Sequence, residues 1–273
     1  MYMCNNRNIA IDIAKGIGIL LVIIGHGAIS SWSKDAIFSF HMPLFFILSG
    51  YFFRDETPLV RMRKDAKRLL LPYVVTIAVI TLYMLVVYQA IKHDGWYYVI
   101  NTLWFWIYPT GAPGGLNFSG PVWFLFALFW TKGTFNLIEK VHNRWFYLIL
   151  AFTAFAPFYL SYLIGRDLPL AISQGLISIV FFWGGYEWKR HETSLQSSRI
   201  KTMMLICLAL WLIGVMCSDL DVMRMIYHNY PLCLLTAFAG TYIVIEISKF
   251  ISKQKGVAIR KVSSFLSWGD KTR

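Results

Sequence analysis

The sequence predicts an all-α, polytopic helical membrane protein with about eight transmembrane helices and both termini in the cytoplasm. Of its 273 residues, 57% are hydrophobic and only 15% are charged. A water-soluble domain of this length cannot bury so much apolar surface, so a membrane protein is the class that fits. Two further observations support this class: the lengths of the apolar segments and the positions of the lysines and arginines.

Eight apolar segments are long enough, or nearly long enough, to cross a bilayer. They are expected to be helices, because continuous apolar runs do not fit the alternating pattern of a membrane β-barrel. We see no internal repeat, linker or second soluble domain, so residues 1–273 are expected to form a single transmembrane domain. The eight segments lie at about 9–30, 37–53, 69–91, 120–138, 145–164, 168–187, 202–219 and 229–251.

The lysines and arginines predict the orientation. Alternate connections, beginning with the one after the first segment, are poor in these residues and hold only Lys34, Lys92, Arg166 and Arg224. The remaining connections and the two chain ends are much richer, which places them in the cytoplasm. The formal net charge of +12 therefore reflects topology and attraction to anionic membrane lipid rather than nucleic-acid binding. We expect a multi-pass protein of the inner or plasma membrane.

Ionisable residues inside the first two apolar segments are the main candidates for chemistry. These are Asp12, Lys15, His26 and His41. A charge or an imidazole in hydrocarbon is unfavourable, so it normally faces the protein interior or a wet cavity. Lys15 and His26 are eleven residues apart, which places them on nearly the same helix face and about 16 Å apart along the axis. Gly18 and Gly25 lie close to that face, where small residues allow another helix to approach.

Each of these residues also has a purely structural interpretation. His26 is either a packing histidine or a general base, because an imidazole can take a proton from a hydroxyl near neutral pH. Asp12 and Lys15 are three residues apart and can form an ion pair, while Lys15 can also bind an anion. His41 precedes Met42-Pro43 and so can mark a helix kink, but its expected depth matches that of His26, which makes a shared cavity possible.

The basic run at residues 61–68 also has two interpretations. One is cytoplasmic charge that fixes the membrane topology. The other is recognition of a phosphorylated donor by Lys64, Lys67 and Arg68. The aromatic-rich connection at about 92–119 is expected to lie on the outer membrane surface or, alternatively, to contact sugar rings. The four cysteines lack metal-ligand spacing, so no metal site is expected.

Two blocks at the start of the chain carry a family resemblance. Asp12-Ile13-Ala14-Lys15-Gly16 with Gly25-His26, and Phe40-His41-Met42-Pro43-Leu44-Phe45-Phe46-Ile47-Leu48-Ser49-Gly50, resemble the acyltransferase 3 family of membrane O-acyltransferases. The most similar branch acetylates bacterial surface polysaccharides. The likeness continues through Arg68-Leu69-Leu70-Leu71-Pro72-Tyr73 and Val122-Trp123-Phe124-Leu125, whereas later segments agree only in hydropathy.

The resemblance implies a reaction and its participants. The family pairs a basic residue with a histidine at the spacing of Lys15 and His26, and it has an arginine pair before the third span, where this chain offers Lys64, Lys67 and Arg68. The implied donor is acetyl-CoA as a co-substrate, with no permanently bound cofactor, and the implied acceptor is a hydroxyl of a cell-surface or lipid-linked saccharide. His26 would act as general base or carry the acetyl group.

Other functions stay open at this point. Intramembrane histidine and lysine also suit a transporter or flippase for a small solute or lipid-linked sugar. The resemblance implies about ten spans, and residues 266–273 look like the approach to a ninth. A naturally short member and an inactive, truncated acyltransferase are therefore both compatible with the sequence.

Overall fold

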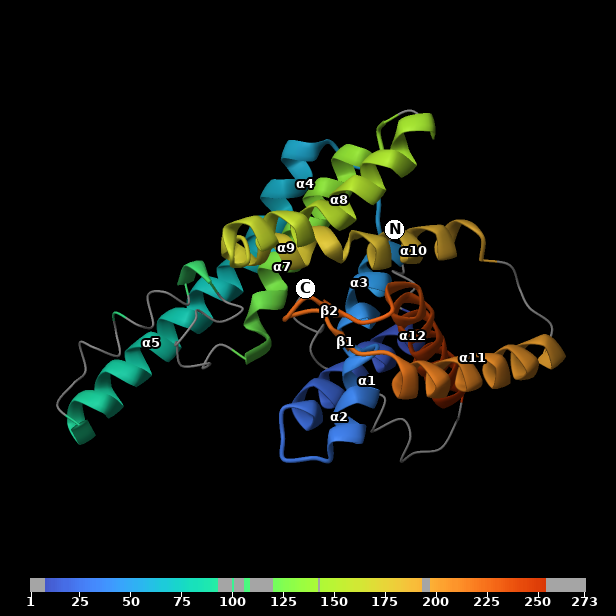
Figure 1. Ribbon diagram of the computed structural model, residues 1–273, viewed down its shortest axis with the longest axis horizontal. Coiled ribbons are helices and arrows are strands. Elements are labelled where there is room, and N and C mark those ends of the chain that lie inside the picture. The colour runs from blue at the N-terminus through green and yellow to red at the C-terminus, as the bar shows by residue number, and fades with distance from the viewer. Residues whose placement is uncertain are drawn as a thin grey trace, which may run out of the picture. The chain divides into compact units, whose positions relative to one another are not determined.

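The computed structural model describes residues 8–92, 100, 106–108, 120–141, 143–192 and 197–253. These residues are almost entirely helical, with one small β-hairpin (Figure 1). The helices are α1 (Ile9–Gly25), α2 (Ser31–Phe38), α3 (His41–Tyr51), α4 (Pro58–Asp65), α5 (Leu71–Lys92), α7 (Trp123–Ile138), α8 (Asn143–Ile164), α9 (Ile172–Ile177), α10 (Ile179–Arg190), α11 (Ser197–Cys217) and α12 (Tyr230–Lys253). A π-helical turn, η1 (Ala66–Leu70), joins α4 to α5, and 3-10 turns η2 (Gly120–Val122) and η3 (Pro169–Ala171) precede α7 and α9.

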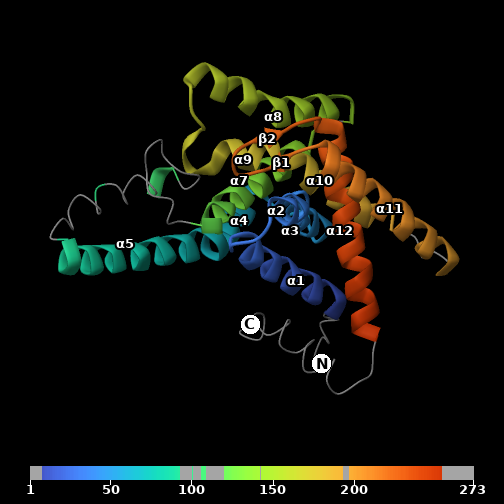
Figure 2. The ribbon, with the colours of Figure 1, turned by 60° about the horizontal axis from the view of Figure 1, so that its bottom comes forward.

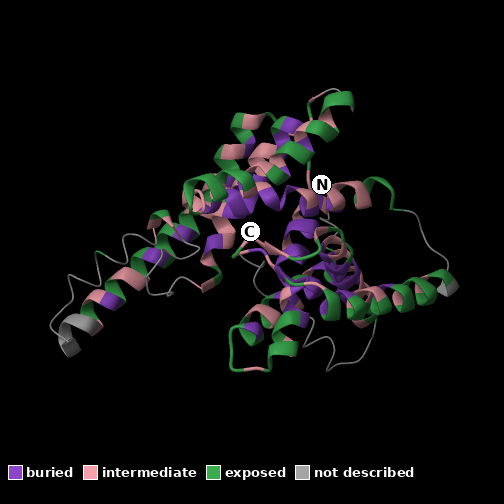
Figure 3. Ribbon diagram, in the orientation of Figure 1, coloured by how far each residue is buried: buried purple, intermediate pink, exposed green. Residues whose placement is uncertain are grey.

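Each of the eight predicted segments contains helix, which confirms the all-α membrane class. Within the described part of the chain, four helices are long and apolar enough to cross a bilayer: Pro58–Val87, Arg144–Ile164, Arg199–Cys217 and Tyr230–Lys253. A fifth candidate is the pair Pro169–Ile177 and Ile179–Arg190, which is bent by 47° at Ser178. Figure 3 shows that α5, α8 and α11 expose much of their length. Their exposed residues include Val79, Phe152 and Leu205, as expected where helices meet lipid.

The second and sixth predicted segments are not continuous helices. The stretch at 37–53 contains the end of α2 and all of α3, and the chain turns between them at Ser39 and Phe40. The Ser39 hydroxyl donates to the carbonyl of Ala36 at 2.8 Å and so closes the end of α2. Hydropathy records apolar character but not the continuity of backbone hydrogen bonds, so it cannot reveal such a break.

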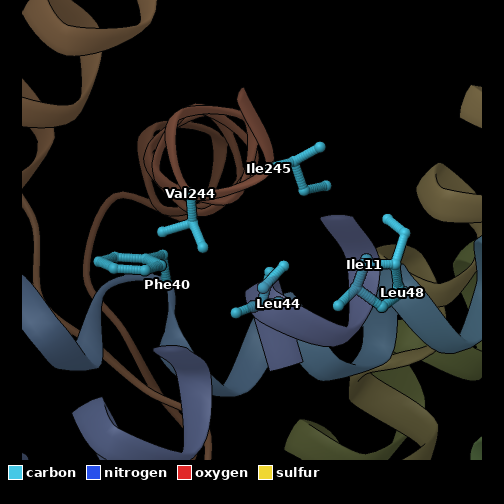
Figure 4. Packing of buried hydrophobic residues seen from close by; sticks show 7 residues of the cluster. Ile11, Phe40, Leu44, Leu48, Val244 and Ile245 are labelled. Carbon is cyan, nitrogen blue, oxygen red and sulfur yellow. The ribbon is translucent and has the colours of Figure 1, made fainter. Parts of the chain in front are cut away.

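The chain divides into two compact units. Unit 1 comprises residues 1–49, 188–221 and 226–273, and unit 2 comprises residues 50–187 and 222–225. Within unit 1, α12 packs along both α11 and α1 (Figure 2). The core of unit 1 includes Ile11, Phe40, Leu44 and Val244, and Figure 4 shows Val244 of α12 lying over Phe40 and Leu44.

Glycines allow the close helix contacts of unit 1. A Cβ atom on Gly240 would lie 2.6 Å from Cγ of Phe40, so the phenyl ring rests directly on the backbone of α12. A Cβ atom on Gly214 of α11 would overlap the side chain of Thr236 in α12. On α1, Gly18 faces Phe45 of α3 and Gly25 faces Phe38 of α2. The predicted role of Gly18 and Gly25 as points of helix approach is therefore confirmed.

Unit 2 is organised around α7. Gly175 of α9 meets α7 so closely that a Cβ atom there would lie 2.6 Å from the carbonyl oxygen of Ala127. The Thr131 hydroxyl lies 2.6 Å from the carbonyl oxygen of Gly175. Phe135 and Phe182 are fully buried in the core of this unit and contact each other, with ring centroids 5.0 Å apart. These contacts join α7, α9 and α10 into one packed layer of unit 2.

A buried charge cluster joins α4 to α7 within unit 2. Asp65, only 3% exposed, accepts from Nε of Arg61 at 3.1 Å and is ion-paired with Nζ of Lys132. Arg61 also donates to the carbonyl oxygen of Arg54 at 2.9 Å and lies over the ring of Phe53. Two cations thus share one buried carboxylate, so part of the basic run at 61–68 has a structural role.

The contact between Phe40 and Gly240 predicts the effect of a single methyl group. We expect Gly240→Ala to lower the free energy of unfolding by about 1–3 kcal/mol, because the added methyl displaces a buried ring. Gly133→Ala is the matched control, since its Cβ atom would lie 3.9 Å from its nearest neighbour, Cγ of Met62. Thermal unfolding of the full chain in detergent measures both. A Gly240→Ala protein as stable as the control would contradict this packing.

The charge cluster predicts a large effect for removing its anion. Asp65→Asn leaves Arg61 and Lys132 buried without a carboxylate, and breaking such a buried pair typically costs about 3–5 kcal/mol. The double variant Asp65→Asn/Lys132→Met should recover part of that loss, because it also removes one uncompensated cation. Unfolding of the same preparations measures both effects. Glu192→Gln, which removes a surface partner of Lys189, serves as the control and should change stability far less.

Candidate functional site

The structure brings His26 and His41 of unit 1 together at one aromatic side chain. The ring centroid of Phe38 lies 5.9 Å from that of His26 and 4.8 Å from that of His41. Nζ of Lys34 lies 5.4 Å from the same ring. Three elements provide these residues: the end of α1, the helix α2 and the start of α3. The predicted neighbourhood of the two histidines therefore exists, with Phe38 between them.

The two histidines differ in burial. His41 is only 1% exposed, at the first position of α3. His26 is exposed in the protein and follows the last residue of α1 as its C-cap. Because α1 ends at Gly25 rather than near residue 30, the imidazole lies at the end of this helix and not within it.

Both imidazole rings are held by the same kind of hydrogen bond. Nδ1 of His26 lies 2.8 Å from the carbonyl oxygen of Val22, and Nδ1 of His41 lies 2.9 Å from that of Ile37. A carbonyl oxygen only accepts, so Nδ1 carries the proton in both rings. Nε2 then has the lone pair, and it is the atom that can take a proton or an acyl group.

Lys15 and Asp12 lie earlier on α1. Lys15 is exposed and Asp12 is partly buried, and both take part in interactions within the protein. Asp12 lies in the first turn of α1, where a carboxylate interacts favourably with the helix dipole. The side chain of Asn8 caps the same turn by accepting from the backbone N–H of Ile11. The geometry leaves Lys15 on the exposed surface of α1, about three turns before His26.

The three predicted phosphate-binding cations lie in unit 2, at the junction of α4 and η1. Lys64, Lys67 and Arg68 are all exposed. Lys67 and Arg68 lie three and four residues after Lys64, so both are on the same helix face as Lys64. Lys67 and Arg68 belong to the π-helical turn η1, and π-helical turns inside helices occur frequently at functional sites. Their exposure sets them apart from Arg61 and Lys132, which are bound to Asp65.

A carboxylate already contacts one of these cations. Nζ of Lys64 lies 3.0 Å from both carboxylate oxygens of Glu56. The hydrogen bond from Lys64 holds the pKa of Glu56 below its ordinary value, and the charges of Arg61 and Arg68 act in the same direction. The backbone carbonyl of Glu56 accepts from Asn136 at 3.1 Å, which ties this segment to α7. An anion thus sits among the cations that were predicted to bind phosphate.

Sequence reasoning missed several residues around these positions. Phe38 was given no role, although it contacts both histidines. His228 was given no role, and Asp219 was expected to end the segment at about 202–219, but the two side chains are hydrogen-bonded to each other across the hairpin. Of the six tryptophans and tyrosines in the aromatic-rich connection at about 92–119, Trp106 and Tyr108 lie within the described residues, and the other four, Trp96, Tyr97, Tyr98 and Trp104, lie outside them. Trp106 accepts from the Tyr73 hydroxyl, and Tyr108 lies under Arg166.

Comparison with known proteins identifies the family of the chain. Over 58 residues the chain is 47% identical to nodulation protein NolL of Mesorhizobium japonicum and 43% identical to that of Sinorhizobium fredii. Each match covers 17% of this chain and 16% of the relative. No solved structure matches the chain. The sequence profile of the acyltransferase domain matches residues 8–267, which include both histidines and the three exposed cations. The chain therefore belongs to the acyltransferase 3 family.

Proposed function

We propose that this protein transfers an acetyl group from acetyl-CoA to a hydroxyl of a cell-surface or lipid-linked saccharide. The observation that carries the proposal is the His26 imidazole, whose Nδ1 is bound to a carbonyl and whose side chain is exposed, in a chain of the acyltransferase family. This tautomer leaves Nε2 as the reactive nitrogen. An exposed ring can meet a substrate, whereas the buried His41 cannot do so without movement of its surroundings.

The proposed roles follow from these positions. His26 acts as general base on the acceptor hydroxyl or carries the acetyl group between donor and acceptor. His41 supports it through Phe38, which contacts both rings. Lys15, on the exposed surface of α1, attracts the anionic donor. The carboxylate of Asp12 adds a negative charge to the first turn of the same helix.

Lys64, Lys67 and Arg68 are proposed to bind the phosphates of coenzyme A. Cations with free access to an anion form strong charge-assisted hydrogen bonds with phosphate oxygens. The position of the Glu56 carboxylate against Lys64 supports this role, since it marks a location that favours negative charge. Glu56 would then compete with the incoming phosphate for Lys64.

The topology belongs to the same proposal. We infer eight spans in one transmembrane domain of the inner or plasma membrane, with both termini in the cytoplasm. The bias of lysine and arginine between alternate connections supports this orientation. In that orientation the turn containing Lys67 and Arg68 faces the cytoplasm, where acetyl-CoA is available, and the end of α1 with His26 faces the outer side.

Replacing the imidazole tests the proposed chemistry. We expect His26→Ala to lower acetylation of the surface glycan by about 100-fold or more, because loss of a general base costs roughly 10²–10⁴ in rate. Base-labile acetate in the glycan of cells expressing the full chain measures the reaction. The exposed His191, between α10 and α11, offers the matched control His191→Ala. Normal acetylation by His26→Ala protein present at normal abundance would reject the mechanism.

Replacing the exposed cations tests donor binding. Lys67→Ala/Arg68→Ala should weaken binding of acetyl-CoA by about 100-fold or more, since each of the two lost hydrogen bonds to a charged group is worth about 1.5–3 kcal/mol. Glu56→Gln should instead strengthen it, because Lys64 loses its competing carboxylate. Equilibrium binding of radiolabelled acetyl-CoA to the purified chain measures both. Lys201→Ala, at an exposed lysine of α11, should not change the affinity. An unchanged affinity in the double variant would remove these residues from the donor site.

A further inference from the structure

A hydrogen-bonded histidine and aspartate lie at the base of the hairpin between α11 and α12. The hairpin pairs β1 (Leu220–Asp221) with β2 (Ile226–Tyr227), in the register Leu220 opposite Tyr227. Asp219 and His228 are the next pair along this ladder, and the backbone N–H of His228 donates to the carbonyl of Asp219 at 3.0 Å. Nδ1 of His228 lies 2.9 Å from Oδ2 of Asp219. Cross-strand neighbours of this kind face each other directly.

The partner of His228 distinguishes it from the other two histidines. His26 and His41 donate to neutral carbonyls, whereas His228 donates to a carboxylate. A carboxylate fixes the Nδ1–H tautomer and also stabilises the imidazolium that forms when Nε2 takes up a proton. His228 therefore has the arrangement that proton abstraction requires. The side chains of His228 and Asp219 are 74% and 65% exposed, so a ligand can reach the pair.

The pair sits on a firmly held part of unit 1. The thiol of Cys233, a fully buried residue, lies 3.0 Å from the carbonyl oxygen of His228 and 3.4 Å from that of Asp219. Leu220 is buried, and β1 contacts α2, the helix that carries Phe38. Within unit 1, the hairpin thus packs against the same helix whose Phe38 touches His26 and His41. An exposed dyad on a rigid support can hold a substrate group in a fixed position.

We propose that Asp219 and His228 form a dyad that binds the acceptor saccharide and takes the proton from its reacting hydroxyl. This inference rests on the proposed acetyl transfer and gives His26 the role of acetyl carrier rather than base. The acetyl carbon first bonds to Nε2 of His26, while its carbon–sulfur bond breaks and the electron pair leaves with the thiolate of coenzyme A. The hydroxyl oxygen then bonds to that carbon, the carbon–nitrogen bond breaks, and its electron pair returns to Nε2 of His26. The hydroxyl proton moves to Nε2 of His228 and then passes to the thiolate or to water. Asp219 holds the ring and balances the positive charge during this step.

Three variants of the full chain in membranes test the dyad, with radiolabelled acetyl-CoA and the lipid-linked saccharide fraction of the same cells as probes. His228→Gln keeps an N–H donor for Asp219 but has no base, so transfer should fall by about 100-fold or more. Asp219→Asn should lower transfer less, because the ring keeps an acceptor but loses the charge. Imidazole in the buffer should restore part of the activity of His228→Ala, which a role limited to closing the hairpin does not predict.

The controls separate this inference from the proposed function. Binding of acetyl-CoA and thermal stability should be unchanged in His228→Gln, and His191→Gln should transfer normally. If His26→Ala abolishes transfer while His228→Gln is fully active, the dyad proposal is wrong and acetyl transfer stands. The same conclusion follows if His228→Ala loses activity together with stability and imidazole restores none of it. If neither His26→Ala nor His228→Gln alters glycan acetylation, the roles proposed for both histidines fail. The proposed function itself fails if cells expressing the unaltered chain acetylate the glycan no more than cells that lack it.

Discussion

The contact of Phe40 with Gly240 is the constraint on which the histidine arrangement depends. The ring rests on the bare backbone of α12, and it also meets Trp211 of α11 edge-on, with ring centroids 6.1 Å apart. The indole N–H of Trp211 donates to the hydroxyl of the neighbouring Ser39 at 3.1 Å. Two helices therefore fix the turn at Ser39 and Phe40. The residues on either side of this turn, Phe38 and His41, are placed as a result, and His26 meets Phe38 from the end of α1.

Unit 2 uses charge in two physically different ways. Arg61 and Lys132 share the buried Asp65, so their cost of desolvation is offset only while all three are present. Lys67 and Arg68 lie on the exposed π-helical turn that follows, and Lys64 is bound to a carboxylate that water can reach. The same short basic run therefore contains both a residue of a buried ion-pair cluster and accessible cations. The cluster of Arg61, Asp65 and Lys132 holds the start of the long helix from Pro58 to Val87 and so positions the exposed cations.

The sequence was sufficient for the features that depend on local composition. Apolar length predicted helix in all eight regions, and the small residues Gly18 and Gly25 predicted where other helices approach α1. It was not sufficient for features that depend on distant residues. The turn at Ser39 is held by a hydrogen bond from Trp211, and the buried Asp65 is ion-paired with Lys132. The Asp219–His228 pair is brought together by a hairpin whose strands have only two residues each. Hydropathy contains no information about such pairings, and the catalytic and phosphate-binding roles stay predictions.

Transfer of label across the membrane tests the proposed acetyl transfer most directly. Inside-out vesicles that contain the protein and the lipid-linked saccharides of the same cells would receive radiolabelled acetyl-CoA on the cytoplasmic face only. Acetyl transfer predicts label in the saccharide fraction that mild base releases as acetate, at a level well above that of vesicles lacking the protein. Label that stays entirely in acetyl-CoA, while the protein is folded and present in the vesicles, would contradict the assignment of this chain as a saccharide O-acetyltransferase.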